Sequence, residues 1–97
     1  MRILWTWGAG LINKVIDMPY YVYVLKSIKD GWLYVGQTSN LQKRLLCHNQ
    51  GGVRSTKGKG PFKIAYVEEY NTRSEAIRRE RFFKSPQGGI LKRKLVK

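Results

Sequence analysis

The sequence YYVYVLKSIKDGWLYVG (20–36) decides the fold of this chain. Its first eight residues are rich in β-branched and aromatic side chains, KDG (29–31) has the composition of a turn, and WLYVG (32–36) predicts the second strand of a hairpin. Because side chains alternate between the two faces of a strand, each strand turns one set to a common face: Tyr21, Tyr23 and Leu25 on the first, and Trp32, Tyr34 and Gly36 on the second. The turn register, and hence which tyrosines lie opposite each other, stays open.

A helix is predicted directly after the hairpin. In SNLQKRLLCHN (39–49), Ser39 precedes Gln42 by three residues, which is the spacing of a capping box. Leucines at helical spacing supply an apolar side, and the glycine pair at 51–52 ends the pattern. We therefore expect a helix near Leu41–Asn49.

The second half of the chain adds one strand and a second long helix. FKIAYVEEY (62–70) predicts a strand, and Thr72 with Glu75 forms another capping box that opens a helix near Arg73–Lys84. The tail QGGILKRKLVK (87–97) is compatible with a short terminal helix. The predicted fold is a small α/β sandwich of the α+β kind, in which helices flank a three-stranded antiparallel sheet with strands at Tyr20–Ser27, Trp32–Gly36 and Phe62–Tyr70.

Residues 1–17, MRILWTWGAGLINKVID, differ in character from the rest of the chain. They are apolar and aromatic but show no sustained period, make a poor signal peptide, and are too short to span a bilayer. We predict an N-terminal extension outside the fold, with Met18 as a second candidate translation start and residues 18–97 as the domain. The alternative is a short amphipathic helix that covers an exposed face of the sheet.

Charge and cysteine content restrict the classes of function. The 97 residues include 19 Lys and Arg against 6 Asp and Glu, for a formal charge of +13, which favours a polyanionic partner. One cysteine allows no internal disulfide and fits a reducing cytoplasm. With a single histidine beside that single cysteine, a structural zinc site is not expected.

Residues 51–61, GGVRSTKGKGP, form a glycine-rich basic segment that resembles a phosphate-binding P-loop only superficially. Gly58-Lys59 is followed by Gly60 instead of Ser or Thr, and a strand instead of a helix comes next. We expect a surface loop that contacts backbone phosphates, and a plain solvated linker is the alternative. The side chains predicted to bind nucleic acid are Arg54, Lys57 and Lys59 and, from the second helix, Lys84.

Glu80 is a carboxylate on the apolar side of the second long helix, the side that also carries Ala76, Ile77 and Phe83. The neighbouring arginines are expected to face solvent: Arg78, Arg79 and Arg81. A carboxylate among apolar side chains is costly unless it is paired or binds a cation. An ion pair with Arg44 or another arginine is one interpretation. The other is Mg²⁺, which keeps several waters and takes further ligands from a substrate phosphate.

The ordered set of motifs resembles the GIY-YIG nuclease domain, especially its small stand-alone bacterial members. Tyr21-Val22-Tyr23 corresponds to the first motif and Tyr34-Val35-Gly36 to the second. In the same resemblance three further positions match the family pattern: Arg44, ten residues beyond Tyr34, then His48, and Glu80 at the place of the metal-binding glutamate. Some positions depart from it: Tyr21 stands where many members have Gly, Gln37 stands where excision-repair members have Lys, and no Asn follows Asn71.

This resemblance implies a metal-dependent endonuclease that hydrolyses DNA phosphodiester bonds, in DNA repair or recombination. One divalent ion, Mg²⁺ or Mn²⁺, would be held by Glu80. Arg44 would offer its guanidinium to phosphate oxygens. Tyr23 would take the proton of the attacking water, with a nearby cation favouring its phenolate. Tyr34 and His48 would position the water or the phosphate, on a sheet face that Arg44 and Glu80 roof.

A catalytically inactive nucleic-acid-binding module of the same fold is the alternative function. The five candidate catalytic residues together favour the nuclease, because binding alone requires none of them. Strand tyrosines outside the motifs are expected to pack, with hydrogen-bonded hydroxyls: Tyr20, Tyr66 and Tyr70. We expect DNA, branched or damaged, as the partner, no membrane, and a cytoplasmic location. A protein partner for targeting, the preferred DNA structure and the oligomeric state stay open.

Overall fold

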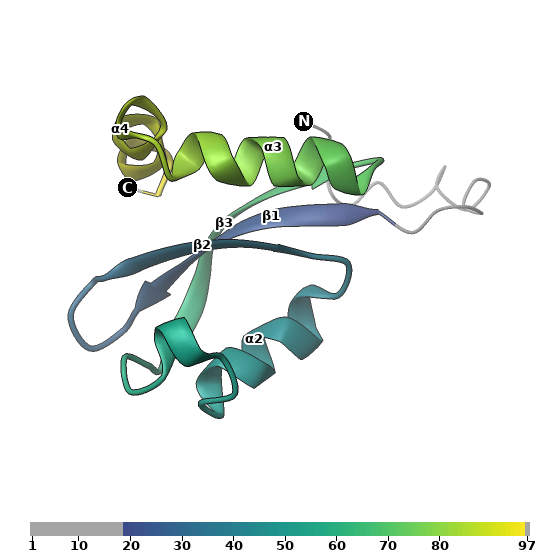
Figure 1. Ribbon diagram of the computed structural model, residues 1–97. Helices are drawn as coiled ribbons and strands as arrows, with labels where there is room; N and C mark the ends of the chain where they lie inside the picture. Colours follow the sequence, from purple (N-terminus) through teal and green to yellow (C-terminus); the bar gives the residue numbers. More distant parts are fainter. Residues whose placement is uncertain (1–18, 97) are drawn as a thin grey trace, which may run out of the picture.

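The computed structural model describes residues 19–96, and three antiparallel strands form its sheet in the order β2-β1-β3 (Figure 1). The strands are β1 (Tyr20–Ser27), β2 (Leu33–Thr38) and β3 (Phe62–Tyr70). The predicted bounds of the first and third strands are confirmed, whereas the second strand begins and ends later than expected. The predicted extension, residues 1–17, lies outside the described residues.

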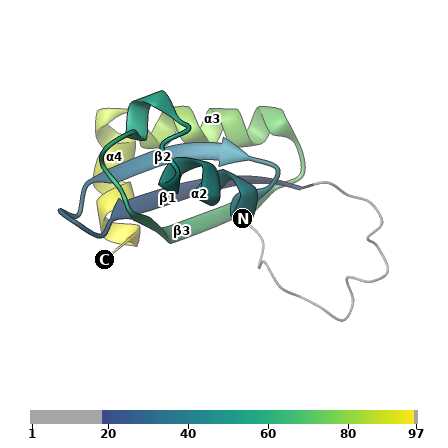
Figure 2. The same ribbon diagram turned by 90° about the horizontal axis from the view of Figure 1, so that it is seen from below.

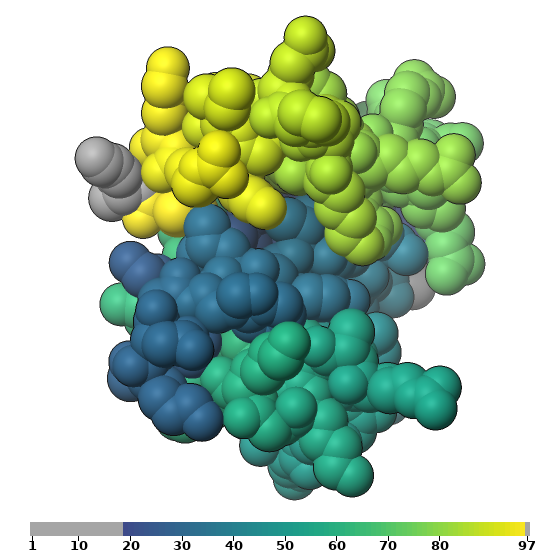
Figure 3. All heavy atoms as spheres, turned by 60° about the vertical axis from the view of Figure 1, so that its left-hand side comes forward, coloured from purple at the N-terminus to yellow at the C-terminus, as the bar shows by residue number. Residues whose placement is uncertain are grey.

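Helices cover both faces of this sheet. On one face lie α2 (Leu41–Asn49) and the short 3₁₀ helix η2 (Arg54–Thr56), and on the other lie α3 (Arg73–Phe83) and α4 (Pro86–Leu95) (Figure 1). Figure 2 shows α2 in front of the strands, and Figure 3 shows the α3–α4 layer, the strands and the loop with η2 stacked from top to bottom. The predicted α+β sandwich is confirmed.

The central strand β1 separates two cores. On the α3 side the core consists of Val22, Val24, Val35, Ala76 and Phe83. On the α2 side it consists of Tyr23, Leu25 and Phe62. Alternate residues of β1 therefore enter opposite cores, as the predicted alternation requires.

Side-chain caps fix where two of the helices begin. The predicted capping box of α3 is confirmed: Thr72 Oγ1 accepts a hydrogen bond from the Glu75 amide at 3.2 Å, and Glu75 Oε1 accepts one from the Thr72 amide at 3.2 Å. The box predicted at Ser39 is wrong. Asn40 caps α2 instead, because its Oδ1 accepts a hydrogen bond from the Lys43 amide at 3.1 Å. Asn is at least as good an N-cap as Ser, so the observed N-cap lies one residue after the predicted one.

The predicted terminal helix is confirmed as α4, which packs closely on α3. Ser85 caps it by accepting a hydrogen bond from the Gly88 amide at 3.1 Å, and Pro86 occupies its first turn. Gly88 is buried, and a Cβ there would collide with the carbonyl of Phe82. The absence of a side chain at this position lets the two helices touch.

A buried carboxylate fastens α3 to β3. Glu68 is 2% exposed and accepts hydrogen bonds from Arg79 Nε at 2.8 Å, Arg79 Nη2 at 3.0 Å, the Tyr66 hydroxyl at 2.8 Å and the Tyr70 hydroxyl at 2.6 Å. Burial alone would raise the pKa of Glu68, but these hydrogen bonds outweigh burial and hold that pKa below its usual range. Tyr66 and Tyr70 therefore pack with bonded hydroxyls, as predicted. The expectation that Arg79 faces solvent is wrong, because two nitrogens of its guanidinium, Nε and Nη2, donate to Glu68.

No helix in residues 19–96 has the length and apolar character needed to cross a membrane.

Candidate active site

A buried chain of hydrogen bonds runs from the sheet into the glycine-rich loop. The Tyr23 hydroxyl on β1 lies 3.0 Å from Nε2 of His48 on α2, and His48 Nδ1 lies 2.8 Å from Oγ1 of Thr56 in η2. The Thr56 hydroxyl donates in turn to the Val53 carbonyl at 3.4 Å. Tyr23 and His48 are each 2% exposed and Thr56 is fully buried. These hydrogen bonds thus link residues 33 positions apart through side chains that are almost completely buried.

The direction of the Thr56 hydrogen bond determines the tautomer of His48. The Thr56 hydroxyl lies within hydrogen-bonding distance of both the Val53 carbonyl and His48 Nδ1. When it donates to the carbonyl, its oxygen accepts the hydrogen bond from His48, and Nδ1 carries the ring proton. Nε2 is then the acceptor for the Tyr23 hydroxyl. In this tautomer His48 is a base directed at the Tyr23 hydroxyl.

The second motif makes room for the Tyr23 ring. In the register between β1 and β2, Tyr23 lies opposite Gly36, and Leu25 lies opposite Tyr34. A Cβ on residue 36 would lie 2.6 Å from Tyr23 Cζ and closer still to the hydroxyl. The phenol therefore crosses β2 at the place where β2 has no side chain, and this sets its hydroxyl against His48.

Burial and charge leave Tyr23 protonated and His48 neutral. Burial raises the pKa of the Tyr23 hydroxyl, and the Arg44 guanidinium beside it lowers that pKa by less. Arg44 therefore favours the phenolate, as expected of a nearby cation, but burial outweighs it. Burial, reinforced by Arg44, holds the pKa of His48 below its usual range. A protonated phenol is thus hydrogen-bonded to a neutral imidazole, which is an arrangement suited to proton transfer.

Glu80 approaches the same site from the other layer. Its helix α3 covers the face opposite α2, and it contacts β2, the strand that carries Tyr34. Lys84 Nζ lies 2.8 Å from Glu80 Oε2 and 5.7 Å from the centroid of the Tyr34 ring. The expectation that Glu80 and Arg44 roof one face is wrong, because the helices that carry them, α3 and α2, lie on opposite faces of the sheet (Figure 1). Its ion-pair partner is also Lys84 rather than an arginine.

The five predicted catalytic residues nevertheless lie together. Tyr34 packs its ring 5.1 Å from that of His48, measured between centroids. The charge of Glu80 is close enough to Tyr23 to contribute to the raised pKa of its hydroxyl. The structure therefore brings two hydroxyls, a guanidinium, an imidazole and a carboxylate to the β2 edge of the sheet.

Glu80 is the side chain of this group that could hold a hard cation. Among residues 19–96 there is no cluster of three or more His, Cys, Asp or Glu side chains that could enclose one. The Glu80 side chain is 20% exposed and its partner Lys84 is 49% exposed, so the carboxylate is accessible and its amine partner can move away. This donor set fits Mg²⁺, which commonly binds one or two carboxylates and completes its shell with water and substrate oxygens.

Comparison with known proteins agrees with this geometry. A family model described as the GIY-YIG catalytic domain matches residues 19–90. The chain belongs to the GIY-YIG family. It is 48% identical over 65 residues to a UPF0213 protein of Clostridium perfringens, covering 66% of this chain and 69% of that protein. It is also 42% identical over 66 residues to a UPF0213 protein of Oceanobacillus iheyensis, covering 67% and 76%.

The fold comparison points to the same family. The solution NMR structure of a UPF0213 protein from Bacillus halodurans matches with a TM-score of 0.50 and 33% identity, over 80% of this chain and 85% of that one. GIY-YIG domains form a nuclease superfamily, so nucleic acid is the class of substrate that the family indicates.

The cations predicted to contact that nucleic acid differ in their surroundings. Arg54, Lys57 and Lys59 are exposed on the loop that carries η2, beside the site. Lys84 is also exposed but is bonded to Glu80. Lys84 is therefore paired with one of the candidate site residues, and Lys59 Nζ lies 4.4 Å from the centroid of the Trp32 ring.

Thr56 is the site residue that sequence reasoning missed. It lies within the glycine-rich loop, whose small and basic residues suggested only backbone contacts or a linker. Residue spacing could not predict that this threonine is hydrogen-bonded to His48, because the contact depends on how the loop folds back over α2. The loop is positioned by the Ser27 hydroxyl, which donates to the Lys59 carbonyl at 2.8 Å.

Proposed function

We propose that this chain is a metal-dependent endonuclease that hydrolyses phosphodiester bonds in DNA. The observation that carries the proposal is the buried Tyr23–His48–Thr56 chain, which ends beside Arg44 and near Glu80. Phosphodiester hydrolysis needs a base for the attacking water and cations for the charge that develops on the phosphate. The side chains gathered at the β2 edge belong to those chemical types.

The proton of the attacking water passes along the Tyr–His pair. As the water oxygen bonds to phosphorus, its proton moves to the Tyr23 oxygen, and the original hydroxyl proton of Tyr23 moves to His48 Nε2. The P–O bond to the leaving oxygen breaks in the same displacement, and the leaving oxygen keeps the bonding electrons and takes a proton from solvent; His48 later returns its extra proton to solvent. His48 becomes an imidazolium whose Nδ1–H still donates to Thr56. This route removes the need for a free phenolate, which burial disfavours at Tyr23.

Arg44 and Glu80 supply the electrostatic part of the proposal. The planar guanidinium of Arg44 can donate two hydrogen bonds to phosphate oxygens, and it stays charged at every relevant pH. Glu80, freed from Lys84, would hold Mg²⁺ or Mn²⁺ together with water and substrate oxygens. A divalent ion bound there would neutralise the scissile phosphate and stabilise the leaving oxygen. Tyr34, between His48 and Lys84, would position the phosphate.

Plasmid nicking by the wild type and Tyr23→Phe tests this function. The assay uses supercoiled plasmid with Mg²⁺, with Mn²⁺ and with chelator, and also branched and damaged duplexes because DNA repair or recombination is the expected setting. Tyr23→Phe keeps the ring that fills the core and removes only the hydroxyl. We expect metal-dependent nicking by the wild type and a loss of about 10²–10⁴-fold in the variant, the usual contribution of an acid–base group.

Two outcomes would contradict the proposal. Equal nicking by both proteins would show that the Tyr23 hydroxyl takes no part in the reaction. Tight DNA binding by the wild type with no cleavage under any metal condition would instead support the inactive binding module of the same fold.

A further inference from the structure

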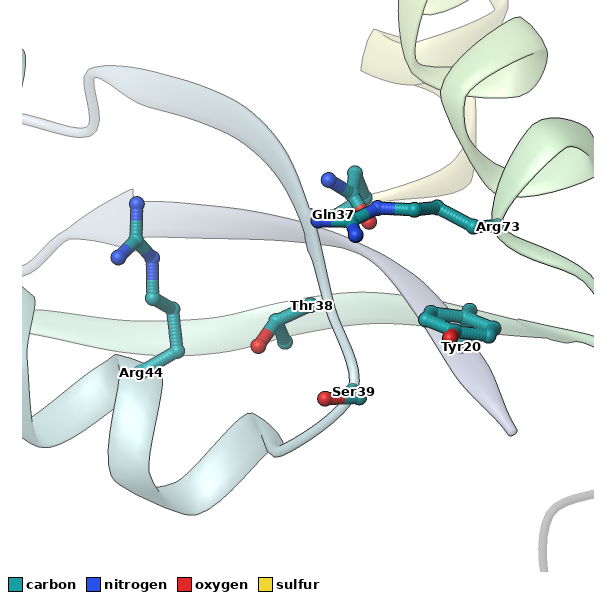
Figure 4. A pocket seen from close by; sticks show the side chains of 6 residues that line it. All are labelled: Tyr20, Gln37, Thr38, Ser39, Arg44 and Arg73. Atoms are coloured by element: carbon teal, nitrogen blue, oxygen red, sulfur yellow. The ribbon is translucent and has the colours of Figure 1, made fainter. Parts of the chain in front are cut away.

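A polar pocket of about 310 Å³ lies next to the proposed reaction site (Figure 4). It is lined by Tyr20, Gln37, Thr38, Ser39, Arg44 and Arg73. Figure 4 shows Arg44 of α2 on one side and Arg73 of α3 on the other, with the end of β2 between them. Because Arg44 also lies beside the Tyr23 hydroxyl, the pocket and the reaction site share one wall.

The two guanidinium groups of this pocket lack an ion-pair partner within the described chain. Neither Arg44 nor Arg73 forms an ion pair with a residue in 19–96, and Arg44 Nε is buried without a hydrogen bond there. The side chains of Gln37 and Ser39 likewise make no hydrogen bond to residues of this range. Nearby carboxylates are already engaged: Glu68 with Arg79, Glu80 with Lys84, and Glu75 in the capping box of α3.

The hydrogen-bond donors that line this pocket favour a phosphate as its ligand. Two guanidinium groups, an amide and hydroxyls surround the pocket, and no carboxylate lines it. Arginine binds phosphate through paired, charge-assisted hydrogen bonds. A carboxylate ligand would be chemically acceptable, but a polyanionic strand also matches the formal charge of +13.

The position of Arg73 on α3 relates this pocket to Glu80. The two residues are seven positions apart, which places them on the same face of the helix and about 10 Å apart along its axis. A nucleic-acid strand advances about 3.4 Å of duplex axis per nucleotide. A strand with one phosphate near Glu80 therefore presents another phosphate at Arg73 within about three nucleotides.

We propose that this pocket is a second phosphate subsite, in which Arg73 and Gln37 hold a backbone phosphate of the strand whose scissile phosphate lies at Tyr23, Arg44 and Glu80. This inference rests on the proposed function, since it assigns the path of the substrate strand. The strand runs from the reaction site past the end of β2 to the first turn of α3. Arg73 is a binding residue there and takes no part in the proton transfers.

The test compares Arg73→Ala and Arg73→Lys with Arg78→Ala. Arg78 is exposed on the same helix, outside this pocket and on a different face, so its removal deletes the same charge without touching the subsite. Binding of a fluorescent duplex oligonucleotide is measured by anisotropy in chelator, where cleavage cannot interfere, at several salt concentrations. We expect Arg73→Ala to weaken binding about 10-fold and to reduce the salt slope by about 1. Arg73→Lys should keep the salt slope and recover part of the affinity, while Arg78→Ala should stay near the wild type.

Equal effects of Arg73→Ala and Arg78→Ala would overturn the subsite, because only bulk charge would then matter. Strong competition by inorganic phosphate with no effect of Arg73→Ala on duplex binding would overturn it too, since the pocket would then take a free anion. If the wild type cleaves, Arg73→Ala should raise KM and leave kcat within about twofold. If the wild type does not cleave but Arg73→Ala alone loses duplex binding, the proposed hydrolysis fails and the phosphate subsite stands.

Discussion

Replacement of Gly36 by alanine should disable the site while leaving the fold intact. The added Cβ would lie 2.6 Å from Tyr23 Cζ, whereas ordinary contacts begin at 3.4 Å, so the ring has to move by about 0.8 Å. Its hydroxyl has to move farther because it lies closer to residue 36. The 3.0 Å hydrogen bond to His48 cannot survive that displacement without a matching shift of α2.

Two magnitudes follow from this displacement. Inserting a methyl group into a packed core costs about 1–3 kcal/mol, which should lower the free energy of unfolding by that amount. Misplacement of a reacting group by about 1 Å costs about 10²-fold in rate. We therefore expect a folded protein with a modest loss of stability and a far larger loss of DNA nicking.

The assays are urea unfolding, plasmid nicking and the NMR signals of the His48 ring, which report the hydrogen bond independently of activity. Gly89→Ala is the control, because its Cβ would meet only Arg93 Nη1 at 3.7 Å and the Phe83 carbonyl at 4.0 Å. As a helix-interior glycine, it should gain about 0.5–1 kcal/mol on replacement by alanine and keep the wild-type rate. Wild-type nicking and an unchanged His48 spectrum in Gly36→Ala would refute the reasoning.

Three further predictions concern the buried hydrogen bonds. Thr56→Val should reduce nicking about 10-fold or more, because the His48 Nδ1–H loses its hydrogen-bond partner, which costs about 1–3 kcal/mol, and the tautomer of His48 is no longer fixed. Thr56→Ser should restore the rate, and failure of that rescue would contradict the role given to the Thr56 hydroxyl. As the pH is lowered, the nicking rate should fall only below pH 6.5, where His48 with its lowered pKa becomes protonated. A fall in rate that begins above pH 6.5 would contradict a role for neutral His48 as the base. Glu68→Gln should destabilise the fold by about 3 kcal/mol, near the low end for a broken buried pair because the Arg79 side chain is 30% exposed. Since the pKa of Glu68 is lowered by folding, its contribution is present above its usual pKa and is lost as pH falls through the folded value, so urea unfolding should show the two proteins converging in acid.

Local patterns were sufficient to predict the sheet and the helices. The alternation in YYVYVLKS and the Thr72–Glu75 box depend on neighbours in sequence, and both elements lie where they were expected. The start of α2 was misassigned because Ser39 and Asn40 are both good caps, and only the helix geometry decides between them. Arg79 was placed in solvent because its partner Glu68 lies on another element, eleven residues earlier.

For the site, too, the sequence was enough to find the residues but not the contacts between distant parts of the chain. The five candidate residues were found through their resemblance to a family, and the fold brings them together. Their connections could not be predicted, since the Tyr23–His48 bond joins β1 to α2 and the His48–Thr56 bond joins α2 to a loop without a periodic pattern. The partner of Glu80 was missed for a different reason: Lys84, one turn further along α3, had been assigned to nucleic acid.

Single-turnover cleavage of a labelled duplex by the wild type and Glu80→Gln, across a titration of Mg²⁺ and Mn²⁺, would decide whether this site performs metal-dependent hydrolysis. Glutamine keeps the size of the side chain and can still accept a hydrogen bond from Lys84. We predict saturable, metal-dependent cleavage by the wild type and a loss of about 100-fold or more in the variant, since metal stabilisation of the transition state contributes several kcal/mol. Duplex binding in chelator should be unchanged. Cleavage by Glu80→Gln at the wild-type rate and with the same metal dependence would contradict the proposed role of Glu80 and, with it, the site described here.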